Sequence, residues 1–83
     1  MEEVVWMVQE SSLARNRKQP LLASLKVAGA SFDRGSVGSG INQLQAFQSK
    51  VRAQVAKDDP GLAAELIRAV QVVIDAVLAG PGG

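Results

Sequence analysis

The sequence predicts an all-α fold, a small up-and-down bundle of three to four antiparallel helices. Apolar residues recur at helical spacing in successive segments, and short polar or glycine-rich turns separate these segments. Turns of this length join neighbouring antiparallel helices. The chain has 83 residues and is 47% hydrophobic, which is enough for one domain with an aliphatic core. We expect residues 1–80 to form a single helical domain and residues 81–83 to be a flexible tail or linker stub.

The first predicted helix covers residues 1–13, where five apolar residues stand in a row at 4–8. Such a run also fits a buried strand, but the carboxylates of Glu2 and Glu3 favour a helix because they complement the dipole at its start. Trp6 is the only tryptophan of the chain. A buried tryptophan anchors a core, and an exposed one is typical of a binding surface. We expect Trp6 to lie in the core.

The second predicted helix follows a polar, basic connector at residues 15–19. We expect Pro20 in the first turn of this helix, where its missing N–H costs nothing. Gly29 indicates close packing against a neighbour, and Gly35 is expected to end the helix. The apolar stripe of the helix consists of Leu21, Leu25, Ala28 and Phe32.

A turn is predicted at residues 35–40, and the third helix from about Ser39. Its apolar stripe consists of Ile41, Leu44, Phe47, Val51 and Val55. Asp59 and Pro60 predict the start of the last helix, as its N-cap and its first residue. Because apolar residues cover much of the girth of this last helix, we expect it to be the central helix of the bundle.

The composition argues against catalysis and metal binding. The chain has no histidine and no cysteine, which are the commonest general base and the commonest zinc ligands. Gly35 and Gly40 have the spacing of the glycines in a phosphate-binding loop. However, Ile41 and Asn42 occupy the positions of the required Lys-Ser/Thr pair, so a flexible turn is the better interpretation.

The acidic residues also fit structural roles better than chemical ones. Asp58 and Asp59 precede Pro60 and lack the alternating oxygen ligands of a calcium loop, so they are better explained as helix caps. Glu65 and Asp75 lie about 15 Å apart along one predicted helix, too far for joint acid–base catalysis. We therefore expect no enzyme activity, no cofactor and no metal ion.

The charges of the chain nearly balance. Nine basic and eight acidic residues give a net charge of +1, whereas nucleic-acid binding usually requires a strong basic excess. We therefore do not expect nucleic acid as the main partner. No apolar run approaches the roughly 20 residues of a membrane span. The candidate contacts to a partner are the basic residues Arg15, Arg17, Lys18, Lys50 and Arg52.

Three motifs carry a resemblance to a known family. Residues 33–35 (Asp-Arg-Gly) give a D-x-G-like turn, residues 42–54 follow the pattern N-x-L-x-A-F-x-x-x-V-x-A-Q, and residues 66–69 follow L-I-x-A. Over about residues 20–78, the chain thereby resembles the FIMAH-type helical module that ends many secreted multidomain bacterial proteins and hydrolases. It departs from the family at residues 55–57, which are Val-Ala-Lys where Gly-Lys often follows. The resemblance implies a non-catalytic appendage of an exported protein, and a secreted or cell-surface location.

We therefore expect a non-catalytic helical accessory, protein-interaction or spacer module of a larger exported bacterial protein. Its partners would be other domains of that parent protein or a separate protein. The first alternative is a self-associating, homodimeric domain in which the apolar last helix is partly buried by a second copy. The weaker alternative is a polyanion or nucleic-acid binder that uses the five basic residues.

Overall fold

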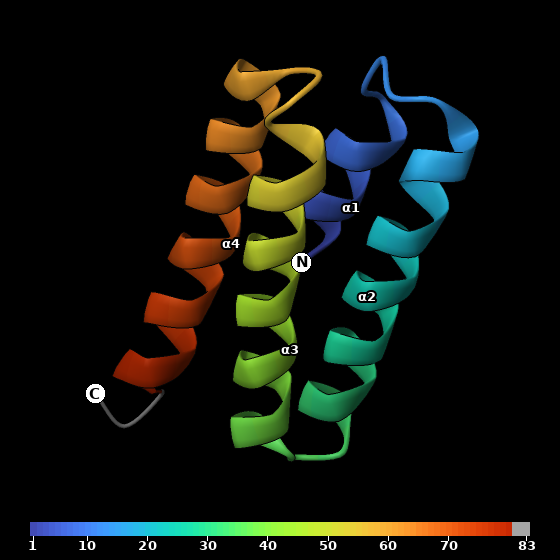
Figure 1. The fold of residues 1–83 in the computed structure, drawn as a ribbon. Helices are drawn as coiled ribbons and strands as arrows, with labels where there is room; N and C mark the ends of the chain where they lie inside the picture. Colours follow the sequence, from blue (N-terminus) through green and yellow to red (C-terminus); the bar gives the residue numbers. More distant parts are fainter. Residues whose placement is uncertain (81–83) are drawn as a thin grey trace.

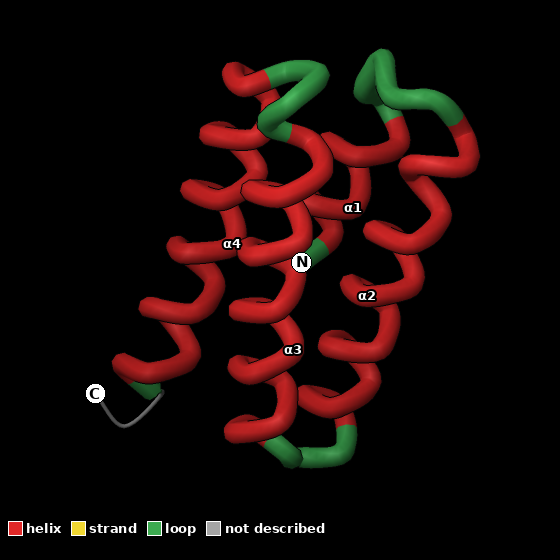
Figure 2. The backbone as a smooth tube through the Cα atoms, viewed as in Figure 1, coloured by secondary structure: helices red, strands yellow, loops and turns green. Residues whose placement is uncertain are grey.

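A computed structural model describes residues 1–80, in which four α-helices and one π-helical turn follow one another. The elements are α1 (Glu2–Gln9), α2 (Arg15–Asp33), α3 (Val37–Lys50), η1 (Val51–Val55) and α4 (Pro60–Ala79). The helices alternate in direction, with short loops at both ends of the molecule (Figures 1 and 2). Each α-helix contacts the next, and α1 also contacts α4. The predicted all-α up-and-down bundle is thus confirmed. The tail expected at 81–83 lies outside the described residues.

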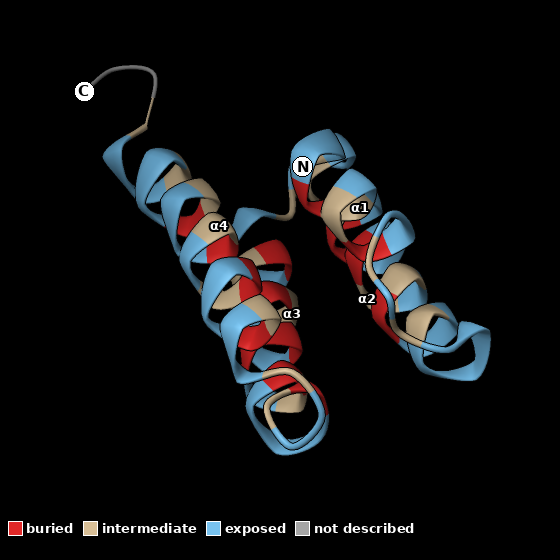
Figure 3. Ribbon diagram, turned by 90° about the horizontal axis from the view of Figure 1, so that it is seen from above, coloured by how far each residue is buried: buried red, intermediate tan, exposed pale blue. Residues whose placement is uncertain are grey.

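The core is a single, mostly aliphatic column between the helices, with Phe47 as its one fully buried aromatic side chain. The described residues span 39 × 20 × 19 Å, which is about two helix diameters across. Buried positions therefore lie on the sides of the helices that face one another, and the outer sides are exposed (Figure 3). The buried apolar residues are Val4, Val8, Leu21, Leu25, Ala28, Leu44, Phe47, Val51, Val55, Ala63, Leu66, Val70 and Ile74.

The close approach of α2 and α3 depends on a glycine. A Cβ atom added to Gly40 would lie 2.6 Å from Cε1 of Phe32, so the Phe32 ring occupies the space that any other side chain would need. Gly40 is buried and lies inside α3, which begins at Val37. The predicted turn at 35–40 is therefore too long. The glycine at its end serves packing between helices instead of a turn.

Two predicted helix ends are confirmed. Gly35 has a φ of 81°, the left-handed conformation that favours glycine after the last turn of a helix. At the start of α4, the backbone N–H of Leu62 donates to Oδ1 of Asp59 at 3.0 Å, and Pro60 is the first helical residue.

The boundaries of the first two helices differ from the prediction. α1 ends at Gln9, and α2 begins at Arg15, so the polar segment 15–19 is helical and not a connector. Arg, Lys and Gln are good helix formers, and this outweighs their polarity. Pro20 is consequently the sixth residue of α2 and not part of its first turn. Its missing N–H leaves the carbonyl of Asn16 without the usual i+4 hydrogen bond.

Two further packing expectations are wrong. A Cβ atom added to Gly29 would have nothing within 4 Å, so this glycine marks no close contact. α4 is not the central helix of the bundle. The four helices form a ring in which each contacts two neighbours, so α4 has an outer side like the others. On the outer side of α4, Val72 is 63% exposed and Leu78 is 68% exposed.

Among residues 1–80, no helix combines the length and apolar character required to cross a membrane.

Buried polar side chains fix how the helices align. Ser31 is fully buried, and its Oγ donates to Oε1 of Gln43 at 2.8 Å, joining α2 to α3. Nε2 of Gln48 donates to the carbonyl of Ile67 and to Oε1 of Gln71, each at 3.1 Å, joining α3 to α4. A sliding helix would leave these buried groups without partners, at about 1–3 kcal/mol for each group.

The two glycines provide a matched pair of substitutions. We expect Gly29→Ala to stabilise the fold by roughly 0.5–1 kcal/mol, because alanine favours the helix and its methyl group meets open space. Gly40→Ala should destabilise it by about 1 kcal/mol, because the Phe32 ring must move. Urea unfolding followed by circular dichroism measures both. Equal effects of the two substitutions would contradict the assigned packing of Gly40.

Candidate interaction surface

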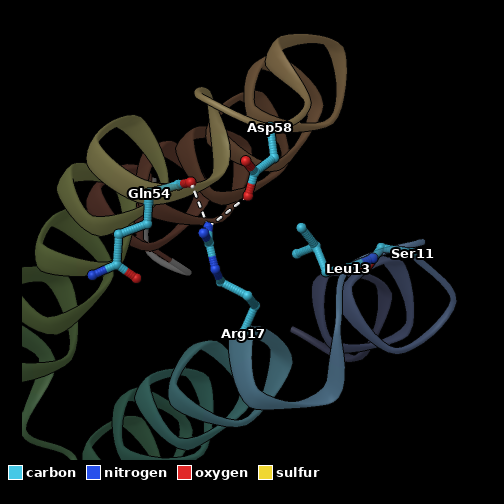
Figure 4. Close-up of polar contacts among 5 residues, drawn as sticks. All are labelled: Ser11, Leu13, Arg17, Gln54 and Asp58. Atoms are coloured by element: carbon cyan, nitrogen blue, oxygen red, sulfur yellow. Dashed lines mark hydrogen bonds and ion pairs between the residues drawn. The ribbon is translucent and has the colours of Figure 1, made fainter.

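Arg17, one of the predicted partner contacts, instead connects parts of the same chain (Figure 4). Its Nη1 donates to the carbonyl of Gln54 at 3.0 Å and lies 2.7 Å from Oδ2 of Asp58. The backbone N–H groups of Asp58 and Asp59 both donate to the carbonyl of Val55, so neither serves Gln54. The guanidinium group thus supplies a donor where η1 ends, a position at which a cation also complements the helix dipole.

Two other candidate contacts also bind within the molecule. Nζ of Lys18 donates to the carbonyl of Gln9 at 2.7 Å, at the end of α1. Nζ of Lys50 donates to Oγ of Ser24 at 3.0 Å, between α3 and α2.

The remaining two candidate contacts, Arg15 and Arg52, make no side-chain hydrogen bond or ion pair with the described part of the chain. The five basic residues therefore do not share one role. Three of them hold neighbouring elements together, and the other two are exposed on separate elements.

A polar hollow of about 500 Å³ lies at the same end of the bundle. It is lined by Ser12, Leu13, Ala14, Asn16, Arg17, Asp58 and Asp59. Both of its carboxylates are engaged, since Asp58 pairs with Arg17 and Asp59 caps α4. The loop that lines it follows Ser11, whose Oγ donates to the carbonyl of Val8 at 2.7 Å. The charged groups of this hollow are thus accounted for by the ends of the helices.

Trp6 lies outside the core, contrary to the prediction, with 61% of its surface exposed. α1 buries Val4 and Val8, which are one helical turn apart, and Trp6 lies midway between them on the opposite side. We call this side the acidic face of α1. It consists of Trp6 and three exposed carboxylates at i−4, i−3 and i+4, namely Glu2, Glu3 and Glu10.

A groove of about 360 Å³ runs between α2 and α3 on the outside of the bundle. We call it the α2–α3 groove. Its only charged residue is Lys50, and Val27 within it is 51% exposed. The groove is lined by Pro20, Ala23, Ser24, Val27, Gln43, Ala46 and Lys50.

A smaller hollow of about 150 Å³ lies between α1 and α4. It is lined by Met1, Glu3, Val4, Ala69, Val72 and Val73. Val72, which is among the most exposed apolar residues, extends this hollow onto the outer side of α4.

The outer surface can therefore recognise a partner through apolar contacts and single charges. Within residues 1–80, no Asp, Glu, Lys or Arg is buried, and no three acidic side chains are grouped so that they could hold a metal ion. The two buried polar residues, Ser31 and Gln48, are both hydrogen bonded.

Comparisons with protein-family models, with curated proteins and with solved structures found no match to this chain.

Neither the acidic face of α1 nor the α2–α3 groove was predicted from the sequence. The spacing of the three glutamates around Trp6 was a visible signal for the acidic face, since i±3 and i±4 positions share one side of a helix. The α2–α3 groove left no comparable signal. Ala23 and Ala46 line it together only because of how two helices pair.

The contacts of Arg17 can be tested by its removal. We expect Arg17→Met to destabilise the fold by about 1–2 kcal/mol, because the carbonyl of Gln54 loses its charged donor and Asp58 its ion pair. Urea unfolding measures the loss. Arg15→Met, on the same turn of α2 but without such contacts, is the matched control and should change stability by less than about 0.5 kcal/mol. An equal effect of both substitutions would show that the contacts of Arg17 with Gln54 and Asp58 do not stabilise the fold.

Proposed function

We propose that this chain is a non-catalytic helical interaction module of a larger exported bacterial protein. The exposure of Trp6 carries the proposal. A surface tryptophan places a large apolar side chain in water, and tryptophan is enriched among the residues that dominate protein interfaces. The α2–α3 groove adds a second apolar surface on other elements. The exported, bacterial parent protein is supported by the resemblance of residues 20–78 to the FIMAH-type module.

Two exposed surfaces of different character suit a module that contacts neighbouring domains. One surface is a protruding aromatic ring among carboxylates, and the other is a shallow groove with one cation. Neither resembles the deep apolar pocket with converging polar groups that is typical of small-ligand sites. The module would therefore act through its outer surface, by holding a protein partner or another domain of the parent protein.

The proposal predicts where a partner contacts the module. When the isotope-labelled chain is titrated with the other domains of its parent protein, the largest NMR shift changes should occur at Trp6 or along the α2–α3 groove. Trp6→Ser should weaken a contact at the acidic face several-fold while leaving the circular dichroism spectrum unchanged. Val37→Ser, at another exposed apolar position, is the matched control and should have little effect. Shift changes confined to the polar hollow, or none at all, would contradict the proposal.

A role as a polyanion binder is the weaker proposal, and it makes a separate prediction. The net charge is +1, and Arg17, Lys18 and Lys50 already bind within the chain. We therefore expect the chain to pass through a heparin column at about 0.15 M salt without retention, because the net charge is nearly neutral and the two unengaged candidates, Arg15 and Arg52, lie on separate elements. Retention that falls steeply with salt and is lost in Arg15→Gln/Arg52→Gln would favour the polyanion role instead.

A further inference from the structure

The α2–α3 groove has the properties of a receptor for a protruding apolar side chain. Small residues, Ala23 and Ala46, form its walls, and no acidic residue lines it. Its volume of about 360 Å³ exceeds that of one aromatic side chain. Lys50 provides a single positive charge, and its hydrogen bond to the neutral Ser24 leaves that charge unpaired.

The acidic face of α1 has the complementary properties. Trp6 is the largest exposed apolar side chain, and carboxylates lie within one turn of it on both sides. α1 carries no basic residue. An indole seated in the groove would bring at least one of these carboxylates toward Lys50, so the apolar and the electrostatic match occur together.

The two surfaces cannot meet within one molecule. Lys18 of α2 reaches the end of α1, whereas Ser24 of α2 reaches Lys50 of α3. These two positions lie about 120° apart around the axis of α2, so the groove opens on a different side of α2 from the one that meets α1. In addition, Trp6 lies on the side of α1 that is turned away from the core.

We propose that the acidic face of α1 docks into the α2–α3 groove of a second copy of this chain. The inference rests on the proposed interaction role and names a second copy as a partner. Because the two surfaces differ, each contact leaves one free groove and one free acidic face, so association continues head to tail instead of ending at a symmetric dimer. One aromatic side chain buries about 150–250 Å², well below the roughly 1,000 Å² of a stable interface, so we expect a weak contact that depends on concentration.

Complementation between two variants tests this arrangement. Trp6→Ser removes the docking side chain and keeps the groove, whereas Ala46→Arg blocks the groove and keeps Trp6. In sedimentation velocity up to about 1 mM chain, a range chosen for a contact this small, the unaltered chain should form dimers and larger species. Each variant alone should remain a monomer. Their equimolar mixture should form a dimer and nothing larger, because each partner keeps only one working surface.

Tryptophan fluorescence gives an independent readout, since the chain has a single tryptophan. In the mixture only the Ala46→Arg copy contains Trp6, so adding the Trp6→Ser copy should shift its emission to shorter wavelength as the indole leaves water. Circular dichroism verifies that both variants are folded, and Ala23→Arg replaces Ala46→Arg if the latter is not.

Three outcomes would overturn the inference. The unaltered chain could remain a monomer throughout, the mixture could fail to dimerise, or each single variant could associate as strongly as the unaltered chain. The last outcome would place self-association on another surface, such as the exposed side of α4 around Val72. A monomeric chain that still binds the other domains of its parent protein would leave the proposed function intact.

Discussion

The close packing of α2 against α3 is the main constraint on this bundle. This pair shares the most extensive contact of the bundle, and the missing side chain of Gly40 admits the ring of Phe32. The same proximity allows Ser31 to reach Gln43 across the interface. Close helices with small outward residues, such as Ala46, leave a shallow groove on their outer side. The packing that stabilises the bundle thus also creates its candidate receptor surface.

At the other end of the α2–α3 pair, basic side chains donate hydrogen bonds to backbone carbonyls that lack another donor. The π-helical turn leads into a sharp bend in which two successive N–H groups converge on Val55, so the carbonyl of Gln54 requires another donor. Arg17 provides it, and Lys18 does the same for Gln9 at the end of α1. Neighbouring basic residues in the sequence therefore serve helix ends here.

The sequence was sufficient to predict what depends on local chemistry. The caps at Gly35 and Asp59 follow from left-handed backbone and N-cap preferences, and the apolar stripes identify most of the core. It was insufficient to predict features that depend on how the helices pair. The sequence does not distinguish Gly29, whose Cβ position has no neighbour within 4 Å, from Gly40, where the Phe32 ring fills the space. The α2–α3 groove escaped prediction for the same reason.

The position of Trp6 follows from the packing of α1. In a ring of four helices each helix directs only one side toward the core, and Val4 and Val8 occupy that side of α1. An apolar run of five residues within it must then place at least one side chain on the outside. The run that suggested a core tryptophan therefore requires an exposed apolar residue. Because that residue is Trp6, set among carboxylates, the one-sided packing of α1 produces the most distinctive surface of the molecule.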